Sequence, residues 1–475
     1  MNSLQNSVVW IGILLLLLAG CGKEISQEMR GGRANDQAAS REQIRRAQEY
    51  LSAGLTGEAE AAFRKVRKEN PESEEAAAGL CRICLLTGRN AEAIQFGEAA
   101  VRINPTLDET WKDLGMAQAR GGRREDAVWS FRKAAQLSPD NASYRNELGV
   151  ALGQLNIFDE AITAFTEAVS IRPHYPEALN NLGMAYLQKN KPAAAEEWLQ
   201  KAVQLNPDYA KGHLNLGIIR QELGKTELAL EEFRLARSLD PDLILASVFS
   251  GAIYFRAGRF EEAEKAYRSI IDRDPEFAPA YIRLGEVALQ QDNPDDAIRL
   301  LEKAVALAPR EAASYDLLGK ARMAKGEYDL AATSFLWALN LEPDHALYYR
   351  HAGELFLAQD RLKEAENALT RASELDPRDA EVYLDLGQLR LRTRDTIEAR
   401  SFFEQAAGLD PEGETGRQAG EALRQLDGTP EPRRQEEAGR EEHFFETIFR
   451  EIKLSPAPSP GNQGNEETPE HMNQP

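Results

Sequence analysis

Residues 108–141 read DETWKDLGMAQARGGRREDAVWSFRKAAQLSPDN and contain the pattern that decides the fold. Their apolar and small residues fall at helical spacing in two runs on either side of Gly122. The first run is Trp111, Leu114, Gly115 and Gln118, and the second is Ala127, Phe131 and Ala134. Pro139 ends the stretch, because proline cannot donate the next helical hydrogen bond. The stretch therefore predicts two helices joined by a tight turn.

The same stretch recurs along the chain with a period of 34 residues. Prolines keep this period at Pro71, Pro105, Pro139, Pro173, Pro207, Pro241, Pro275, Pro309, Pro343, Pro377 and Pro411. Alanines follow it from Ala59 to Ala399, and glycines follow it from Gly115 to Gly387. A fixed period of this length indicates an array of supersecondary units, here eleven helix-turn-helix repeats. We expect the small residues to mark points where two backbones approach closely.

Between the two helices of each repeat the chain carries a residue that tolerates a left-handed backbone. These residues are Gly54, Gly88, Gly122, Asn156, Asn190, Gly224, Gly258, Asp292, Gly326 and Asp360. We expect each of them to end the first helix of its repeat.

The residues Trp111, Leu114, Gly115, Ala127, Phe131, Ala134 and Pro139 together resemble the signature of the tetratricopeptide repeat. The resemblance covers residues 40–413 and implies an all-α fold, an α-solenoid of about eleven 34-residue repeats that form a right-handed superhelix. One helical hairpin cannot bury its apolar stripe alone, so neighbouring repeats stack into a continuous core. Residues 414–427 are expected to form a helix that caps the array.

The N-terminal segment has the pattern of an export signal. From Val8 to Gly20 the chain has no charged residue, and this run is shorter than the roughly 20 residues needed to span a bilayer. It ends in Leu18-Ala-Gly-Cys21, which resembles the lipobox of bacterial lipoproteins. The resemblance implies a signal peptide over 1–20, an acylated Cys21, a tether over 21–39 and a periplasmic location. Gly22 in place of Asp implies the outer membrane. An uncleaved N-terminal anchor is the alternative.

The charge of the chain restricts its partners. It has 77 acidic and 57 basic residues and a formal net charge of -20. Such a surface repels nucleic acid phosphates and anionic lipid. We therefore expect no nucleic acid partner, and membrane attachment through the lipid alone.

Cys81 and Cys84 form a CxxC pair, which is a redox signature when it opens a helix beside a sheet. Here Cys81 stands at the position of the repeated glycine, and Cys84 at that of Tyr186 and Tyr254, so both thiols are expected in the core. The sequence offers no catalytic set, four-ligand metal site or cofactor motif, and predicts a non-enzymatic protein. A redox or metal-linked factor that uses the two cysteines is the alternative.

The resemblance implies a concave groove lined by the first helix of each repeat, where protein or peptide segments bind. The candidate groove residues are Asn146, Asn180, Asn181, Leu214, Asn215, Ile218, Leu245, Val248, Phe255, Arg256, Ile282 and Arg283. Asparagine amides can hydrogen-bond a peptide backbone of any sequence. Similar asparagine ladders occur in O-linked N-acetylglucosamine transferases, so an adaptor for a separate glycosyltransferase is a further alternative. The apolar members can instead pack between neighbouring helices.

The C-terminal residues 428–475 are rich in Pro, Gly and charge, a composition typical of disorder. Within them, residues 441–454 carry an apolar stripe of Phe444, Phe445, Ile448, Phe449 and Ile452. This segment is predicted to dock in the groove of the same molecule, with another protein or the membrane as alternatives. Together the features predict a lipid-anchored interaction scaffold of the cell envelope, as in pilus and secretin, polysaccharide-export or outer-membrane assembly.

Overall fold

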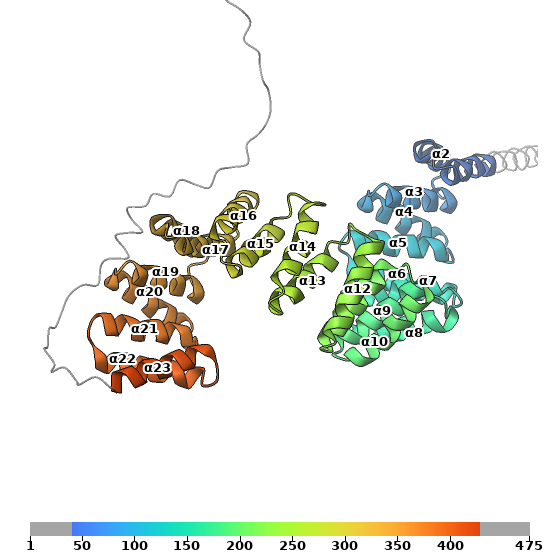
Figure 1. The fold of residues 1–475 in the computed structure, drawn as a ribbon. Helices are drawn as coiled ribbons and strands as arrows, with labels where there is room; N and C mark the ends of the chain where they lie inside the picture. The colour runs from blue at the N-terminus through green and yellow to red at the C-terminus, as the bar shows by residue number, and fades with distance from the viewer. Residues whose placement is uncertain (1–39, 428–475) are drawn as a thin grey trace, which may run out of the picture. The chain divides into compact units, whose positions relative to one another are not determined.

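The computed structural model describes residues 40–427, and the regular structure in that range is entirely α-helical (Figure 1). These residues divide into two compact units, with the boundary between Ala246 and Ser247. Helices follow one another as antiparallel pairs joined by short turns, so the predicted all-α solenoid of helix-turn-helix repeats is confirmed. The handedness of the superhelix stays a prediction.

The first unit begins with helical residues 40–52. It continues with α2 (Thr56–Glu69), α3 (Glu74–Leu86), α4 (Asn90–Ile103), α5 (Asp108–Arg120), α6 (Arg124–Leu137), α7 (Ala142–Gln154), α8 (Phe158–Ile171), α9 (Pro176–Gln188), α10 (Pro192–Leu205), α11 (Ala210–Glu222) and α12 (Thr226–Leu239). Each odd-numbered helix from α3 to α11 packs against the even-numbered helix that follows it, and each even-numbered helix from α2 to α10 packs against the next repeat.

The second unit comprises α13 (Leu245–Arg256), α14 (Phe260–Ile271), α15 (Ala278–Gln290), α16 (Pro294–Leu307), α17 (Ala312–Ala324), α18 (Tyr328–Leu341), α19 (Ala346–Ala358), α20 (Leu362–Leu375), α21 (Ala380–Arg392), α22 (Thr396–Leu409) and α23 (Glu414–Asp427). From α15 to α22 it repeats the packing of the first unit. The last helix, α23, packs against α21 and α22 and buries Ala419 beside Phe403.

The repeated glycine of each first helix receives a bulky side chain from the second helix of the same repeat. A Cβ placed on Gly217 would lie 2.6 Å from the Phe233 ring, and one on Gly285 would lie 2.6 Å from Leu301. The series therefore marks a close approach, as predicted. The neighbouring group is mainly a ring or leucine side chain, and not the backbone that we expected, because the missing Cβ makes room for a larger residue opposite.

The second repeat reverses this arrangement. Cys81 occupies the glycine position, and Gly97 occupies the position of the bulky residue that Phe131 fills one repeat later. A Cβ on Gly97 would lie 3.0 Å from the Cys81 Sγ atom and 3.1 Å from Leu114 Cδ1. The thiol thus takes part of the space that an aromatic ring fills in the third repeat.

The turns confirm the predicted left-handed residues. All ten have positive φ angles, from 53° at Asp292 to 81° at Gly326. The eleventh turn has the same conformation at Arg394, with a φ of 65°, although arginine rarely adopts it. The 34-residue period places a left-handed residue at position 394, but an arginine does not indicate this backbone conformation.

A side-chain hydrogen bond ties many first helices to the proline turn before them. The Trp111 indole donates to the Pro105 carbonyl at 2.9 Å, and the Tyr281 hydroxyl donates to the Pro275 carbonyl at 3.1 Å. His213, Tyr315 and Tyr383 contact the carbonyl six residues earlier in the same way. These bonds fix the angle at which the chain enters the helix.

Candidate functional site

The first helices of consecutive repeats touch one another within each unit. In the first unit α3 contacts α5, α7 contacts α9, and α9 contacts α11. Residues on their shared side are therefore neighbours in space although they are about 34 residues apart in sequence (Figure 1).

Four asparagines on α7, α9 and α11 form one hydrogen-bonded row, which we call the asparagine ladder (Asn146, Asn180, Asn181 and Asn215). The Asn215 amide donates to Asn180 Oδ1 at 2.8 Å, and the Asn181 amide donates to Asn146 Oδ1 at 3.0 Å. Asn180 Nδ2 donates to Asn181 Oδ1 at 3.3 Å and joins the two pairs. Asn146 and Asn180 are buried, whereas Asn181 and Asn215 are half-buried.

Two of the three hydrogen bonds in the ladder join residues that are 35 apart in sequence, which is one repeat plus one residue. The same offset joins His351 on α19 to Asp316 on α17, where Nδ1 lies 2.8 Å from Oδ1. This offset is therefore the contact register between neighbouring first helices in both units. Polar residues that are 35 apart on neighbouring first helices therefore meet. The ladder forms because three successive first helices, α7, α9 and α11, carry asparagine at these positions.

The apolar candidates are distributed over the two units. In the first unit Leu214 on α11 is buried and Ile218 is half-buried. Leu245, at the start of α13 and the end of the first unit, is 48% exposed, whereas Val248 and Phe255 in the second unit are half-buried. Each unit thus contributes its own apolar residues, and Leu214 belongs to the packed interior.

The remaining second-unit candidates lie near the surface. Ile282 on α15 is half-buried, and the exposed Arg283 forms an ion pair of 2.7 Å with Glu286. Arg256 at the end of α13 is exposed, and the Phe255 ring makes an edge contact with Phe260. Arg283 is thus already engaged by a carboxylate on its own helix.

A cavity of about 290 Å³ lies in the first three repeats, between helix 40–52, α2, α3 and α5; we call it the acidic cavity. It is lined by Gln48, Leu51, Phe63, Glu75, Ala78, Gly79, Arg82, Leu107, Asp108, Glu109, Thr110 and Asp113. In its wall the Phe63 ring packs directly on Gly79, where a Cβ would lie 2.5 Å from the ring. The sequence analysis missed this site, because its carboxylates come from helices that are adjacent only after folding.

The one cation of the lining, Arg82, is already shared by two carboxylates. Its Nε donates to Asp113 Oδ2 at 2.8 Å, and its Nη2 lies 3.0 Å from Glu109 Oε1. Asp108 instead accepts hydrogen bonds from the hydroxyls of Ser138 and Tyr144. The Ser138 bond is the main reason that the pKa of Asp108 lies below its usual value, so this carboxylate is ionised at neutral pH.

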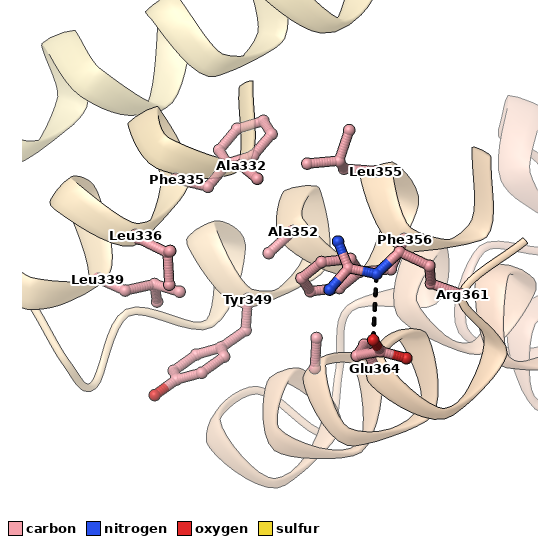
Figure 2. Close-up of a pocket in the computed structure, with 11 residues that line it drawn as sticks. Ala332, Phe335, Leu336, Leu339, Tyr349, Ala352, Leu355, Phe356, Arg361 and Glu364 are labelled. Carbon is pink, nitrogen blue, oxygen red and sulfur yellow. Dashed lines mark hydrogen bonds and ion pairs between the residues drawn. The ribbon is translucent and has the colours of Figure 1, made fainter. Parts of the chain in front are cut away.

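A second cavity, of about 160 Å³, lies between α18, α19 and α20 in the second unit (Figure 2). Its walls are mainly apolar, and the small side chains of Ala332, Ala352 and Ala368 leave its space unfilled. The Arg361 guanidinium lies over the Phe356 ring at 4.6 Å. An apolar space of this size stays dry in a protein core, so we interpret it as a packing gap between repeats.

The two cysteines are free and buried, as their positions in the repeat predicted. Burial raises the pKa of Cys81 to about 12 and also raises the pKa of Cys84. A thiol in this state is a poor nucleophile and metal ligand, because the thiolate is the reactive form. Within residues 40–427, no group of three or more His, Cys, Asp and Glu side chains is placed to hold a metal ion. The structure therefore gives the redox alternative no support.

Two predicted features, Cys21 and the segment 441–454, lie outside the described residues. Among the described helices, none combines the length and apolar character needed to cross a bilayer.

Comparison with known families agrees with the repeat pattern. A tetratricopeptide repeat family model matches residues 44–108, 112–176, 152–210, 180–244, 317–369 and 352–414, and a second model of the same description matches residues 254–321. No curated protein matches the chain.

Several solved structures are similar to the chain. Yeast Tom70 is 18% identical over 82% of this chain and 96% of its own, with a TM-score of 0.39. A tetratricopeptide repeat protein from Parabacteroides merdae is 20% identical over 53% of this chain and 98% of its own, with a TM-score of 0.46. PilF of Pseudomonas aeruginosa is 23% identical over 42% of this chain and 92% of its own, with a TM-score of 0.37.

Proposed function

The chain belongs to the tetratricopeptide repeat family, and we propose that it is a non-enzymatic scaffold that binds an extended peptide segment along the asparagine ladder. The observation that carries this proposal is the hydrogen-bonded row across α7, α9 and α11.

The ladder has hydrogen-bonding capacity beyond its internal bonds. Each asparagine amide has two N–H donors and one carbonyl acceptor with two lone pairs. The three internal bonds use one N–H each from Asn180, Asn181 and Asn215. The half-buried Asn181 and Asn215 therefore keep one N–H each for a ligand. A peptide backbone offers carbonyls and N–H groups at regular spacing, so it can pair with this row whatever its side chains are.

The site sits on a rigid support. Asn146 and Asn180 are both 6% exposed, so the helices around them hold their amides in place. A preorganised row loses little side-chain entropy when a ligand binds, which favours affinity. A fixed surface that binds one segment of a partner is typical of a scaffold. Cys81 and Cys84 are buried, so they supply no reactive thiol at this surface.

We further propose that the scaffold is attached to the periplasmic face of a bacterial outer membrane through a lipid on Cys21. Support for this proposal comes from the Leu18-Ala-Gly-Cys21 sequence after an apolar run. Within the envelope, assembly of pili and secretins, polysaccharide export and outer-membrane assembly are the processes in which such a scaffold would act.

The anchoring proposal is tested by labelling cells with a palmitate analogue that carries an alkyne. The native chain should incorporate the label, and Cys21→Ser should not. Label retained in Cys21→Ser would disprove the lipid anchor.

The binding proposal is tested with a set of fluorescein-labelled dodecapeptides of Ala, Ser, Thr, Gly and Gln, with one variable position; we call these the probe peptides. Replacing Asn181 and Asn215 together with alanine should weaken binding about tenfold or more, because two side-chain hydrogen bonds are worth about 1 kcal/mol each. The matched control is Asn340→Ala, since Asn340 is exposed on α18 in the other unit. Equal affinities of the native and doubly substituted chains in fluorescence anisotropy would refute the ladder as the binding site.

A further inference from the structure

We propose that the acidic cavity takes up a lysine or arginine side chain of the peptide bound at the asparagine ladder, and so selects a basic partner segment. This inference rests on the proposed function and names the chemistry of its ligand. The cavity, its charge balance and its link to the ladder each support it.

The lining of the cavity has an excess of negative charge. Glu75, Asp108, Glu109 and Asp113 face it together with the single cation Arg82. Arg82 is shared by Glu109 and Asp113, and Lys112 lies 2.7 Å from Asp113 Oδ1 outside the lining. Within residues 40–427, neither Glu75 nor Asp108 forms an ion pair. An additional cation would therefore find two carboxylates that are not yet neutralised.

Asp108 is held in place before any ligand arrives. Its carboxylate accepts from the Ser138 hydroxyl, and also from the Tyr144 hydroxyl at 3.3 Å. Tyr144 is only 5% exposed, and burial raises its pKa to about 12, so the phenol keeps its proton and remains a donor. The carboxylate thus stays ionised and oriented, which lowers the cost of binding a cation.

The shape of the cavity suits a long basic side chain. Leu51, Phe63, Ala78 and Leu107 provide apolar wall, and the carboxylates lie beside it. Lysine and arginine have an apolar stem and a charged end, and they bury the stem where the end can reach polar groups. A volume of about 290 Å³ is larger than such a side chain, which leaves room for water around the charge.

The cavity and the ladder lie on the same side of the first helices. Ala78 and Asp113 of the cavity are 35 residues apart, and they stand at the repeat positions that Asn146 and Asn181 of the ladder occupy two repeats later. Both sites therefore lie on the side where first helices contact one another. Their helices follow one another along the first unit. One extended peptide can therefore place its backbone on the ladder and a basic side chain in the cavity. The net charge of -20 adds a long-range attraction for a basic segment.

The experiment compares probe peptides that carry arginine, lysine, citrulline or norleucine at the variable position. Citrulline has the shape of arginine without its charge. We expect the arginine and lysine peptides to bind the native chain about tenfold more tightly than the citrulline and norleucine peptides, and the difference to shrink at high salt. In the variant with Glu75→Gln and Asp108→Asn the difference should fall to about twofold or less.

Two further variants separate charge from folding. Glu75→Gln alone changes an exposed side chain and should remove part of the preference without affecting the fold. Glu125→Gln removes the same charge from an exposed position on α6 and should leave the preference unchanged.

The outcomes distinguish this inference from the proposed function. Equal binding of arginine and citrulline peptides, or a preference that persists in the doubly substituted chain, would overturn the cavity as a cation site, while the ladder stays supported by its own variants. A complete lack of binding by all probe peptides would refute the proposed function and this inference together.

Discussion

The reversed pair in the second repeat, Cys81 and Gly97, makes a quantitative test of how these repeats pack. Gly97→Phe places an aromatic ring where the third repeat has Phe131. Its Cβ alone would lie 3.0 Å from the Cys81 sulfur, so the ring must displace the thiol or α3. Overpacking of this kind costs about 1–3 kcal/mol.

Cys81→Gly removes a fully buried thiol and places glycine within α3. The helix loses about 1 kcal/mol from the glycine, and the lost burial of a group of methylene size costs about 0.8 kcal/mol more. If the two changes acted independently, the double variant would lose about 4 kcal/mol. The structure predicts instead that the ring introduced at position 97 fills the space left by the thiol at position 81, as Phe131 does above Gly115, so that the loss is about 1 kcal/mol.

The assay is a double-mutant cycle measured by urea unfolding and by amide hydrogen exchange of α3 and α4. Local exchange is needed because repeats in an array can unfold separately. A coupling of about 3 kcal/mol corresponds to more than a hundredfold difference in the opening constant. The reverse exchange in the third repeat, Gly115→Cys with Phe131→Gly, is the matched control and should also show coupling. A double variant no more stable than Gly97→Phe alone would refute the reasoning.

Three other predictions follow from single residues. Arg394→Gly should stabilise the last repeat by about 1 kcal/mol, because glycine adopts the φ of 65° without steric cost, and an unchanged urea midpoint would contradict this. Burial raises the pKa of Asp385 to about 8, above its unfolded value, so its protonated form favours folding and stability should decrease as pH rises from about 4 to 8; Asp385→Asn should flatten that dependence in amide exchange of α21. Cys81 and Cys84 should react slowly with a thiol reagent in the native protein and fast in urea, and rapid native reaction would show that their helix opens.

Most of the fold was predictable because the repeat places a small number of constraints in every unit. Proline ends the second helix, a left-handed residue ends the first, and a small residue admits a bulky one opposite. Arg394 was missed because its side chain does not indicate the backbone conformation that the repeat imposes. The bulky partner of Gly217 was not anticipated, since a sequence period does not say which atoms fill the space beside a glycine.

The candidate site was predictable only in part. Asparagines on successive first helices were expected on nearby positions, but the contacts between Asn146 and Asn181 depend on a 35-residue offset that arises only when the helices pack. The acidic cavity depends on the ring of Phe63 lying against Gly79, and on carboxylates from the second and third repeats. Such a site is a product of stacking, so no single stretch of sequence contains it.

The asparagine ladder also has a direction. Its three hydrogen bonds all run in one order, from Asn215 to Asn180, then to Asn181 and to Asn146. If one internal amide rotated by half a turn, it would set N–H against N–H on one side and oxygen against oxygen on the other. Only rotation of all four restores three hydrogen bonds, so the row has two satisfied states of opposite polarity and switches between them as a unit. A peptide that donates to one end of the row would favour one state over the other, and the row would then distinguish the two directions in which the same peptide can lie.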